Sequence, residues 1–157
     1  MKQILDVLNR LAENYDLPVI VSTHPRTRKR LEGLNNVNID KRIQFLKPFG
    51  FFDYIKLQQD SLCAISDSGT ISEESAMLSF PAISLRQSME RPEAQDAGTI
   101  ILTGFDPEVV LHSIHMAIEE QKSGNYKEIP QEYQIANTSW RVLKLIMGNT
   151  KLSNRWW

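Results

Sequence analysis

The sequence is poor in several features that mark whole classes of protein. Its 157 residues include one cysteine, Cys63, which excludes an internal disulfide scaffold. Seven glycines and seven prolines argue against a low-complexity chain. Eighteen Lys and Arg against 19 Asp and Glu leave a net charge of −1, so we expect no nucleic-acid partner. One globular domain is the expectation at this length.

Long apolar runs are also absent. No stretch approaches the ~20 residues that a membrane-spanning helix needs, and the first residues lack the apolar core of a secretory signal. We therefore expect no membrane partner and a reducing, cytoplasmic location. Cys63 lies in the apolar run 62–65, where a buried, inert thiol is expected rather than a nucleophile.

Helical and extended patterns alternate along the chain. Apolar residues recur at helical spacing from Ile4 to Tyr15, so the chain is expected to begin in an amphipathic helix. Strands are expected at 19–21, 62–65, 82–85 and 99–102, with a further one at either 37–39 or 43–46. Helices are expected at 27–31, 51–59, 70–79, 107–121 and 139–147. This order predicts an α/β, Rossmann-like fold, with a parallel sheet sandwiched by helices and ligands at the carboxyl ends of its strands.

The strongest local pattern lies between the strand that ends at Ile65 and the helix that starts at Thr70. The turn Ser66-Asp67-Ser68-Gly69 is small and polar. Free N–H groups and the dipole at a helix N-terminus favour an anion, and Gly69 lets a phosphate approach the backbone. Simple helix capping, by Asp67 or Ser68 or through a capping box over 70–73, is the alternative.

Glu74 favours the binding interpretation. On a helix it shares a flank with the apolar residues Ile71, Met77 and Leu78, where a carboxylate needs a partner. Ribose hydroxyls, one turn from a phosphate site, are a suitable partner. Glu73 is expected to belong to the helix cap instead.

Two more polar segments follow expected strands. Segment 86–93 carries two Arg and two Glu and is expected beside the first turn, with Arg86 as a ligand contact; a solvated loop before a helix starting at Pro92 is the alternative. His24, after the first strand, suits a phosphate or a sugar hydroxyl, although a structural or surface role is the commoner case. His112 and His115 are expected on a solvated helix face, because no third metal ligand is visible and no metal site is predicted.

The ordered motifs between Asp67 and Thr99 closely resemble the bacterial non-hydrolysing UDP-N-acetylglucosamine 2-epimerase family. These motifs are Asp67 to Glu74, Phe80-Pro81-Ala82, Arg86, Glu90 to Ala94 and Ala97-Gly98-Thr99. Tyr54-Ile55-Lys56-Leu57 and the tail Ser153-Asn154-Arg155-Trp156 are similar to the branch that forms UDP-N-acetyl-fucosamine. The resemblance covers essentially the whole chain, but only the C-terminal part of the family.

The resemblance implies a glycosyltransferase-B arrangement, in which two Rossmann-like domains face a cleft. Residues 1–135 would be the UDP-binding domain, and residues 136–157 a C-terminal helix and tail. The N-terminal domain, with the acidic catalytic residues, and the strand before the first helix lie outside this chain. No catalytic residue is therefore expected here, the fragment alone is expected to be inactive, and the full-length family implies a homodimer.

The resemblance also assigns roles by position. Ser68, Gly69 and the amide of Thr70 match the diphosphate-binding turn, although the family usually has a second glycine in place of Thr70. Glu74 matches the carboxylate that binds the ribose hydroxyls. The segment 48–54, with Phe49 and Tyr54, matches the stretch that holds uracil, largely through its backbone. The remaining assignments are Arg86, Glu90 and Arg91 on the sugar or cleft side, and His24 at an allosteric UDP-sugar site.

The family reaction inverts carbon 2 of a UDP-N-acetylhexosamine for surface polysaccharide synthesis. UDP leaves by anti elimination to give a glycal, and syn re-addition then follows on the other face; the scheme requires no cofactor. A helix terminus would stabilise the departing diphosphate. Two alternatives stay open: the nucleotide-sugar-binding half of a glycosyltransferase, and a non-catalytic nucleotide-binding or interaction module.

Overall fold

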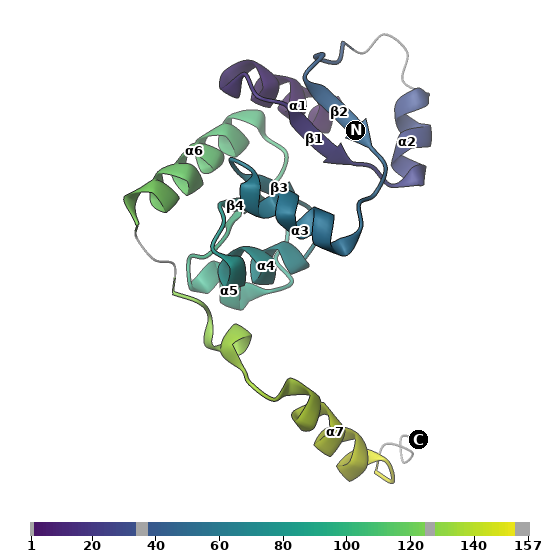
Figure 1. Cartoon of the computed structure of the whole chain (residues 1–157), viewed down its shortest axis with the longest axis vertical. Coiled ribbons are helices and arrows are strands. Elements are labelled where there is room, and N and C mark those ends of the chain that lie inside the picture. Colours follow the sequence, from purple (N-terminus) through teal and green to yellow (C-terminus); the bar gives the residue numbers. More distant parts are fainter. Residues whose placement is uncertain (1, 34–37, 125–127, 153–157) are drawn as a thin grey trace.

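Helices alternate with short parallel strands in the computed structural model, which describes residues 2–33, 38–124 and 128–152 (Figure 1). The helices are α1 (Lys2–Tyr15), α2 (Pro25–Glu32), α3 (Phe51–Asp60), α4 (Thr70–Leu78), α5 (Pro92–Asp96), α6 (Pro107–Ser123), the 3-10 helix η1 (Gln131–Gln134) and α7 (Thr138–Asn149). The strands are β1 (Val19–Ser22), β2 (Ile43–Leu46), β3 (Ala64–Ser66), β4 (Ala82–Ser84) and β5 (Ile101–Leu102).

The second strand is β2, so the alternative at 43–46 is the correct one. The other candidate, 37–39, begins outside the described residues, and its described part, residues 38 and 39, is not a strand. The predicted α/β class with parallel strands is confirmed.

The strands form two parallel sheets, β1–β2 and β3–β4–β5, where the sequence predicts one. The N–H of Val19 donates to the carbonyl of Arg42, just before β2, at 3.0 Å, and the N–H of Thr23 donates to that of Leu46 at 2.9 Å, so Ile20 and Ser22 direct their backbone polar groups away from β2. Within the described residues, no strand pairs with the outer edge of β1 or of β3.

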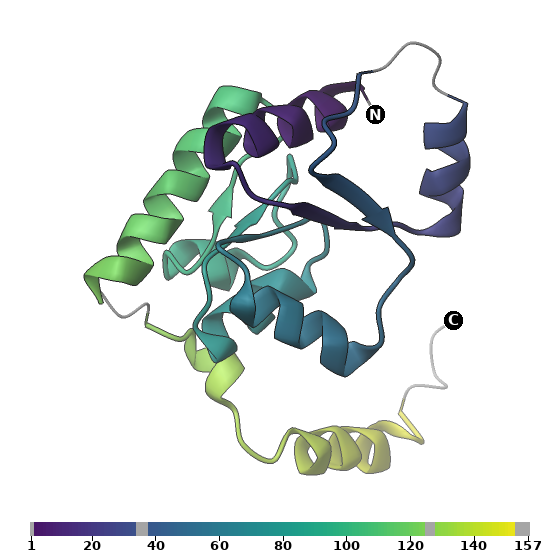
Figure 2. The ribbon, with the colours of Figure 1, turned by 45° about the horizontal axis from the view of Figure 1, so that its top comes forward.

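Helices cover both faces of the β3–β4–β5 sheet. On one face Ile83 of β4 packs with Val7 and Leu11 of α1 and Val110 of α6, and on the other Ala82 packs with Ile71 of α4. This arrangement follows from the two-residue period of a strand, which turns successive side chains to opposite faces. In the views of Figures 1 and 2, α1 lies beside both sheets, and its other apolar residues contact Ile43 of β2.

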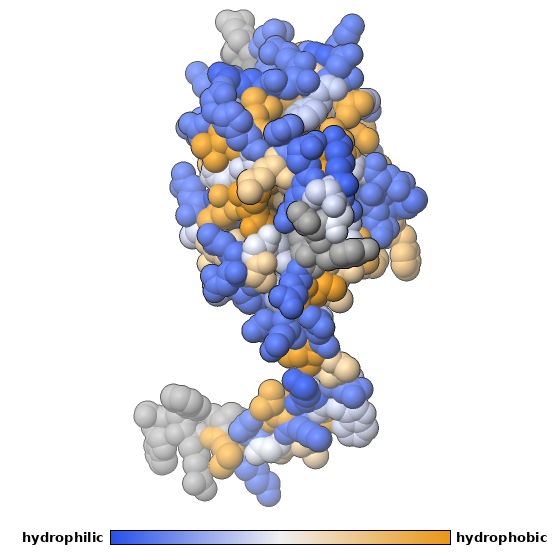
Figure 3. All heavy atoms as spheres, turned by 90° about the vertical axis from the view of Figure 1, so that its left-hand side faces the viewer, coloured by the Kyte–Doolittle hydropathy of each residue, from blue (hydrophilic) through white to orange (hydrophobic). Residues whose placement is uncertain are grey.

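The α7 helix projects away from the body of the molecule (Figures 1 and 2). All of its residues are exposed, including Trp140, Leu145 and Met147 at 62, 63 and 72%. Figure 3 shows this arm at the bottom, with apolar side chains among polar ones. The domain boundary predicted after residue 135 falls between η1 and α7 and stays a prediction, and the tail 153–157 lies outside the described residues.

No described helix combines the length and the apolarity that a membrane span would need. Cys63 is half-buried rather than fully buried, and it packs against the apolar cluster that Ile83 of β4 forms with residues of α1 and α6. His112 and His115 are both exposed on α6, as expected.

Candidate functional site

The turn between β3 and α4 is organised by small hydroxyl side chains. Ser68 donates its N–H to Ser66 Oγ at 3.0 Å, and Ser68 Oγ lies 2.9 Å from Thr70 Oγ1. Gly69 is the N-cap of α4 and offers no capping side chain, while the N–H of Thr70 has only a long contact of 3.4 Å with Ser68 Oγ. The capping alternative is therefore realised only weakly, and the start of α4 keeps donors suited to an anion.

Glu73 does not form the predicted capping box, and that prediction is wrong. Its carboxylate instead forms an ion pair with Arg91, which precedes α5. The sequence pattern placed Glu73 correctly in the first turn of α4. The loop after β4, however, folds over this turn and brings the guanidinium of Arg91 close to Glu73. The resulting ion pair replaces the predicted capping-box hydrogen bond.

The loop 86–91 lies directly against Gly69, so the structure brings two predicted segments together. A Cβ atom added at Gly69 would lie 3.4 Å from Arg91 Nε, 3.6 Å from Glu90 Oε2 and 3.7 Å from Arg86 Nη1. Arg86 Nη2 donates to Glu90 Oε1 at 2.5 Å, and this hydrogen bond raises the pKa of Arg86 and lowers that of Glu90. Two guanidinium groups thus flank the N-terminus of α4.

Glu74 is half-buried one turn further along α4, beside α3. Its Oε2 accepts a hydrogen bond from Gln58 Nε2 at 2.7 Å. Burial raises the pKa of Tyr54, which lies four residues before Gln58, and the nearby charge of Glu74 raises it further. Of the predicted uracil contacts, Tyr54 therefore lies next to Glu74.

Sequence reasoning missed Gln58. It is 5% exposed and contacts Glu74 from a different helix. The available signal was its spacing of four residues from Tyr54, which places both side chains on one face of α3. Phe49, the other predicted uracil contact, lies half-buried just before Gly50, the N-cap of α3.

His24 lies on the other sheet, at the carboxyl end of β1. It is the N-cap of α2, and its Nδ1 accepts a hydrogen bond from the N–H of Arg26 at 3.3 Å. The structure thus gives it a capping role, consistent with the structural alternative. Its predicted allosteric role stays a prediction.

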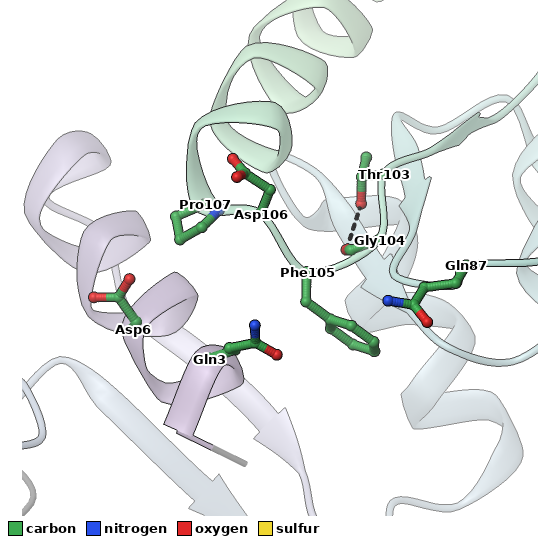
Figure 4. A pocket seen from close by; sticks show the side chains of 8 residues that line it. All are labelled: Gln3, Asp6, Gln87, Thr103, Gly104, Phe105, Asp106 and Pro107. Carbon is green, nitrogen blue, oxygen red and sulfur yellow. Dashed lines mark hydrogen bonds between the residues drawn. The ribbon is translucent and has the colours of Figure 1, made fainter.

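Two shallow pockets lie outside the β3–α4 turn. One, of about 500 Å³, is lined by Thr23, Pro25, Arg28, Lys29, Lys47 and Pro48. The other, of about 350 Å³, lies between the start of α1 and the loop after β5, and its lining includes Gln87, the neighbour of Arg86 (Figure 4). Pro48, at the start of the predicted uracil segment 48–54, lines the first of these pockets, whereas Ser68, Gly69 and Glu74 line neither.

Comparison with known proteins identifies relatives of this chain. The family model described as UDP-N-acetylglucosamine 2-epimerase matches residues 1–147. A UDP-N-acetylglucosamine 2-epimerase of Methanocaldococcus jannaschii is 31% identical over 126 residues, which are 78% of this chain and 34% of that protein.

Solved structures agree. That of UDP-N-acetylglucosamine 2-epimerase from Rickettsia bellii is 39% identical with a TM-score of 0.86, over 98% of this chain and 42% of that one. The M. jannaschii enzyme in complex with UDP-GlcNAc and UDP is 28% identical with a TM-score of 0.80, over 93% of this chain and 40% of that one. This chain thus spans about two fifths of the length of these enzymes. On the match over residues 1–147, the chain belongs to the UDP-N-acetylglucosamine 2-epimerase family.

Proposed function

We propose that this chain is the UDP-binding, C-terminal half of a UDP-N-acetylhexosamine 2-epimerase. The observation that carries the proposal is the position of Gly69, at an uncapped helix N-terminus and against Arg86 and Arg91, with Glu74 one turn away. The complex of the M. jannaschii relative with UDP-GlcNAc and UDP supports a nucleotide-sugar ligand for this fold.

The proposed roles follow from the charge of each group. The diphosphate lies at Ser68, Gly69 and the amide of Thr70, where the helix dipole favours negative charge and Arg86 and Arg91, each paired with a carboxylate, lie nearby. The Glu74 carboxylate accepts hydrogen bonds from the ribose hydroxyls. The uracil contacts the segment 48–54, including Phe49 and Tyr54, largely through its backbone.

In the proposed reaction the C1–O bond to UDP and the C2–H bond break, which gives a glycal, UDP and a proton. UDP then returns to C1 on the face that it left, and a proton is added to C2 from the opposite face to the one from which it was removed, a syn addition that inverts C2 alone. The negative charge that develops on the leaving diphosphate is stabilised by groups that are already in place at the start of α4. Arg86, Glu90 and Arg91 face the sugar side of this anion.

The complete reaction needs more than this chain, which covers about two fifths of its relatives. We propose that the acidic residues that move the proton come from an N-terminal domain, that the full enzyme is a homodimer in the cytoplasm, and that it serves surface polysaccharide synthesis. This chain alone is proposed to bind UDP without turnover, so epimerisation by the isolated chain would contradict this part.

Calorimetric titration of the chain with UDP and with UMP tests the proposal. UDP is expected to bind saturably and about tenfold or more tightly than UMP, because the second phosphate reaches the helix N-terminus. Glu74→Ala is expected to weaken UDP binding about tenfold through loss of charge-assisted hydrogen bonds, whereas Glu13→Ala, exposed on α1, serves as the control. Equal affinities for UDP and UMP, or no binding of UDP, would refute the proposal.

A further inference from the structure

Gln58 is a buried amide of which only the nitrogen is hydrogen-bonded among the described residues. The side chain is 5% exposed, and its Nε2 donates to Glu74 Oε2 at 2.7 Å. Its Oε1 is buried and has no hydrogen-bond partner among the described residues. A buried acceptor without a donor is unfavourable, and an apolar side chain of the same size would avoid this cost. Folding alone therefore gives little reason for glutamine at position 58.

The contact with Glu74 supplies a reason. The amide presents its nitrogen to the carboxylate, since the reverse orientation would set two acceptor oxygens against each other. Glutamine is a neutral donor, so it fixes the direction of the carboxylate without neutralising its charge. A carboxylate has about four lone-pair sites on its two oxygens, and Gln58 uses only one of them.

Tyr54, the neighbouring side chain on α3, does not occupy the lone pairs of the Glu74 carboxylate. Tyr54 lies one turn before Gln58, and the hydrogen bond that Glu74 accepts within the described residues comes from Gln58 and not from Tyr54. Gln58 is thus the side chain whose hydrogen bond sets the angle at which Glu74 meets a ligand above the turn.

We propose that Gln58 is a positioning residue that orients Glu74 toward ribose hydroxyls and thereby sets the preference for UDP over 2′-deoxy-UDP. The inference rests on the proposed function, which places the ribose at Glu74. It adds a residue on a second helix to the site and assigns it a part in choosing between ribose and deoxyribose.

The test compares Gln58→Met, which conserves length and burial, with Gln59→Met on the exposed face of α3. Affinities of the full chain for UDP and 2′-deoxy-UDP are measured together with its melting temperature. Gln58→Met is expected to weaken UDP binding about five- to tenfold, to leave 2′-deoxy-UDP binding nearly unchanged and not to lower the melting temperature. Gln59→Met is expected to change none of these. An unchanged preference with a lowered melting temperature would make Gln58 merely structural and overturn the inference.

A swapped pair, Gln58→Glu with Glu74→Gln, provides the second variant. It keeps one amide and one carboxylate in contact, so it is expected to fold normally, but it moves the negative charge to α3. The preference for UDP over 2′-deoxy-UDP is expected to be lost in this variant. Discrimination between the two ligands as in the wild-type chain would overturn the inference.

Glu74→Ala separates the two proposals. If this variant loses the preference while Gln58→Met keeps it, the ribose site stands and the role of Gln58 fails. If the unmodified chain binds no UDP, the proposed function fails and the inference falls with it.

Discussion

At the scale of single residues, Gly69 is the position where a small change is most informative. Its backbone φ of −64° suits any residue, so Gly69→Ala is expected to change the free energy of unfolding by no more than about 1 kcal/mol. The new methyl group, however, would lie 3.4 Å from Arg91 Nε, in the space through which a phosphate approaches the start of α4. UDP affinity is therefore expected to fall about tenfold or more.

The control for this variant is Gly148→Ala on α7, where an added Cβ meets nothing within 4 Å. Titration calorimetry and thermal melting of both variants separate binding from folding. Unchanged UDP affinity in Gly69→Ala would show that the diphosphate does not approach this turn.

The partners of Glu73 and Glu74 show which contacts the sequence does not predict. Glu74 was predicted to need a partner because it lies on an apolar helical flank, and this inference uses only the period of one helix. Its actual partner in the chain, Gln58, comes from α3, and Glu73 pairs with Arg91 from beyond β4. Contacts between elements depend on how those elements pack, and the periodicity of one helix carries no information about that packing.

At the scale of elements, the order of helices and strands follows from hydrophobic periodicity, whereas strand pairing does not. The sequence predicts each strand within two or three residues, but not the division into β1–β2 and β3–β4–β5. Parallel pairing joins segments that are distant in sequence, so it is decided by the whole assembly. The two sheets also differ in burial: Ile83 of β4 is 0% exposed, whereas Ile20 of β1 is 47% exposed.

This difference predicts unequal costs for the same substitution. Ile83→Ala is expected to lower the free energy of unfolding by about 2–5 kcal/mol, because it opens a cavity between β4, α1 and α6. Ile20→Ala is expected to cost only about 1 kcal/mol, because half of its side chain is already in water. Urea denaturation of the two variants measures both values. Equal costs would mean that β1 is as deeply buried in solution as β4.

At the scale of the whole molecule, the exposed α7 is what separates this chain from a self-contained domain. Its apolar residues include Trp140, Leu145, Ile146 and Met147, all more than half exposed, and exposed apolar side chains on one helix favour association. The chain is also only about two fifths as long as its relatives. We therefore expect the isolated chain to self-associate through α7 as its concentration rises.

The double variant Leu145→Ser/Met147→Ser tests this expectation. It is expected to weaken self-association in sedimentation experiments without lowering the melting temperature of the body, since α7 is fully exposed and projects from it. The matched control, Met77→Ser/Met116→Ser, alters two exposed methionines on α4 and α6 and is expected to leave association unchanged. If the α7 variant instead lowers the melting temperature, α7 packs against the body in solution. In that case its apolar face stabilises this domain itself, and no second surface is needed to cover it.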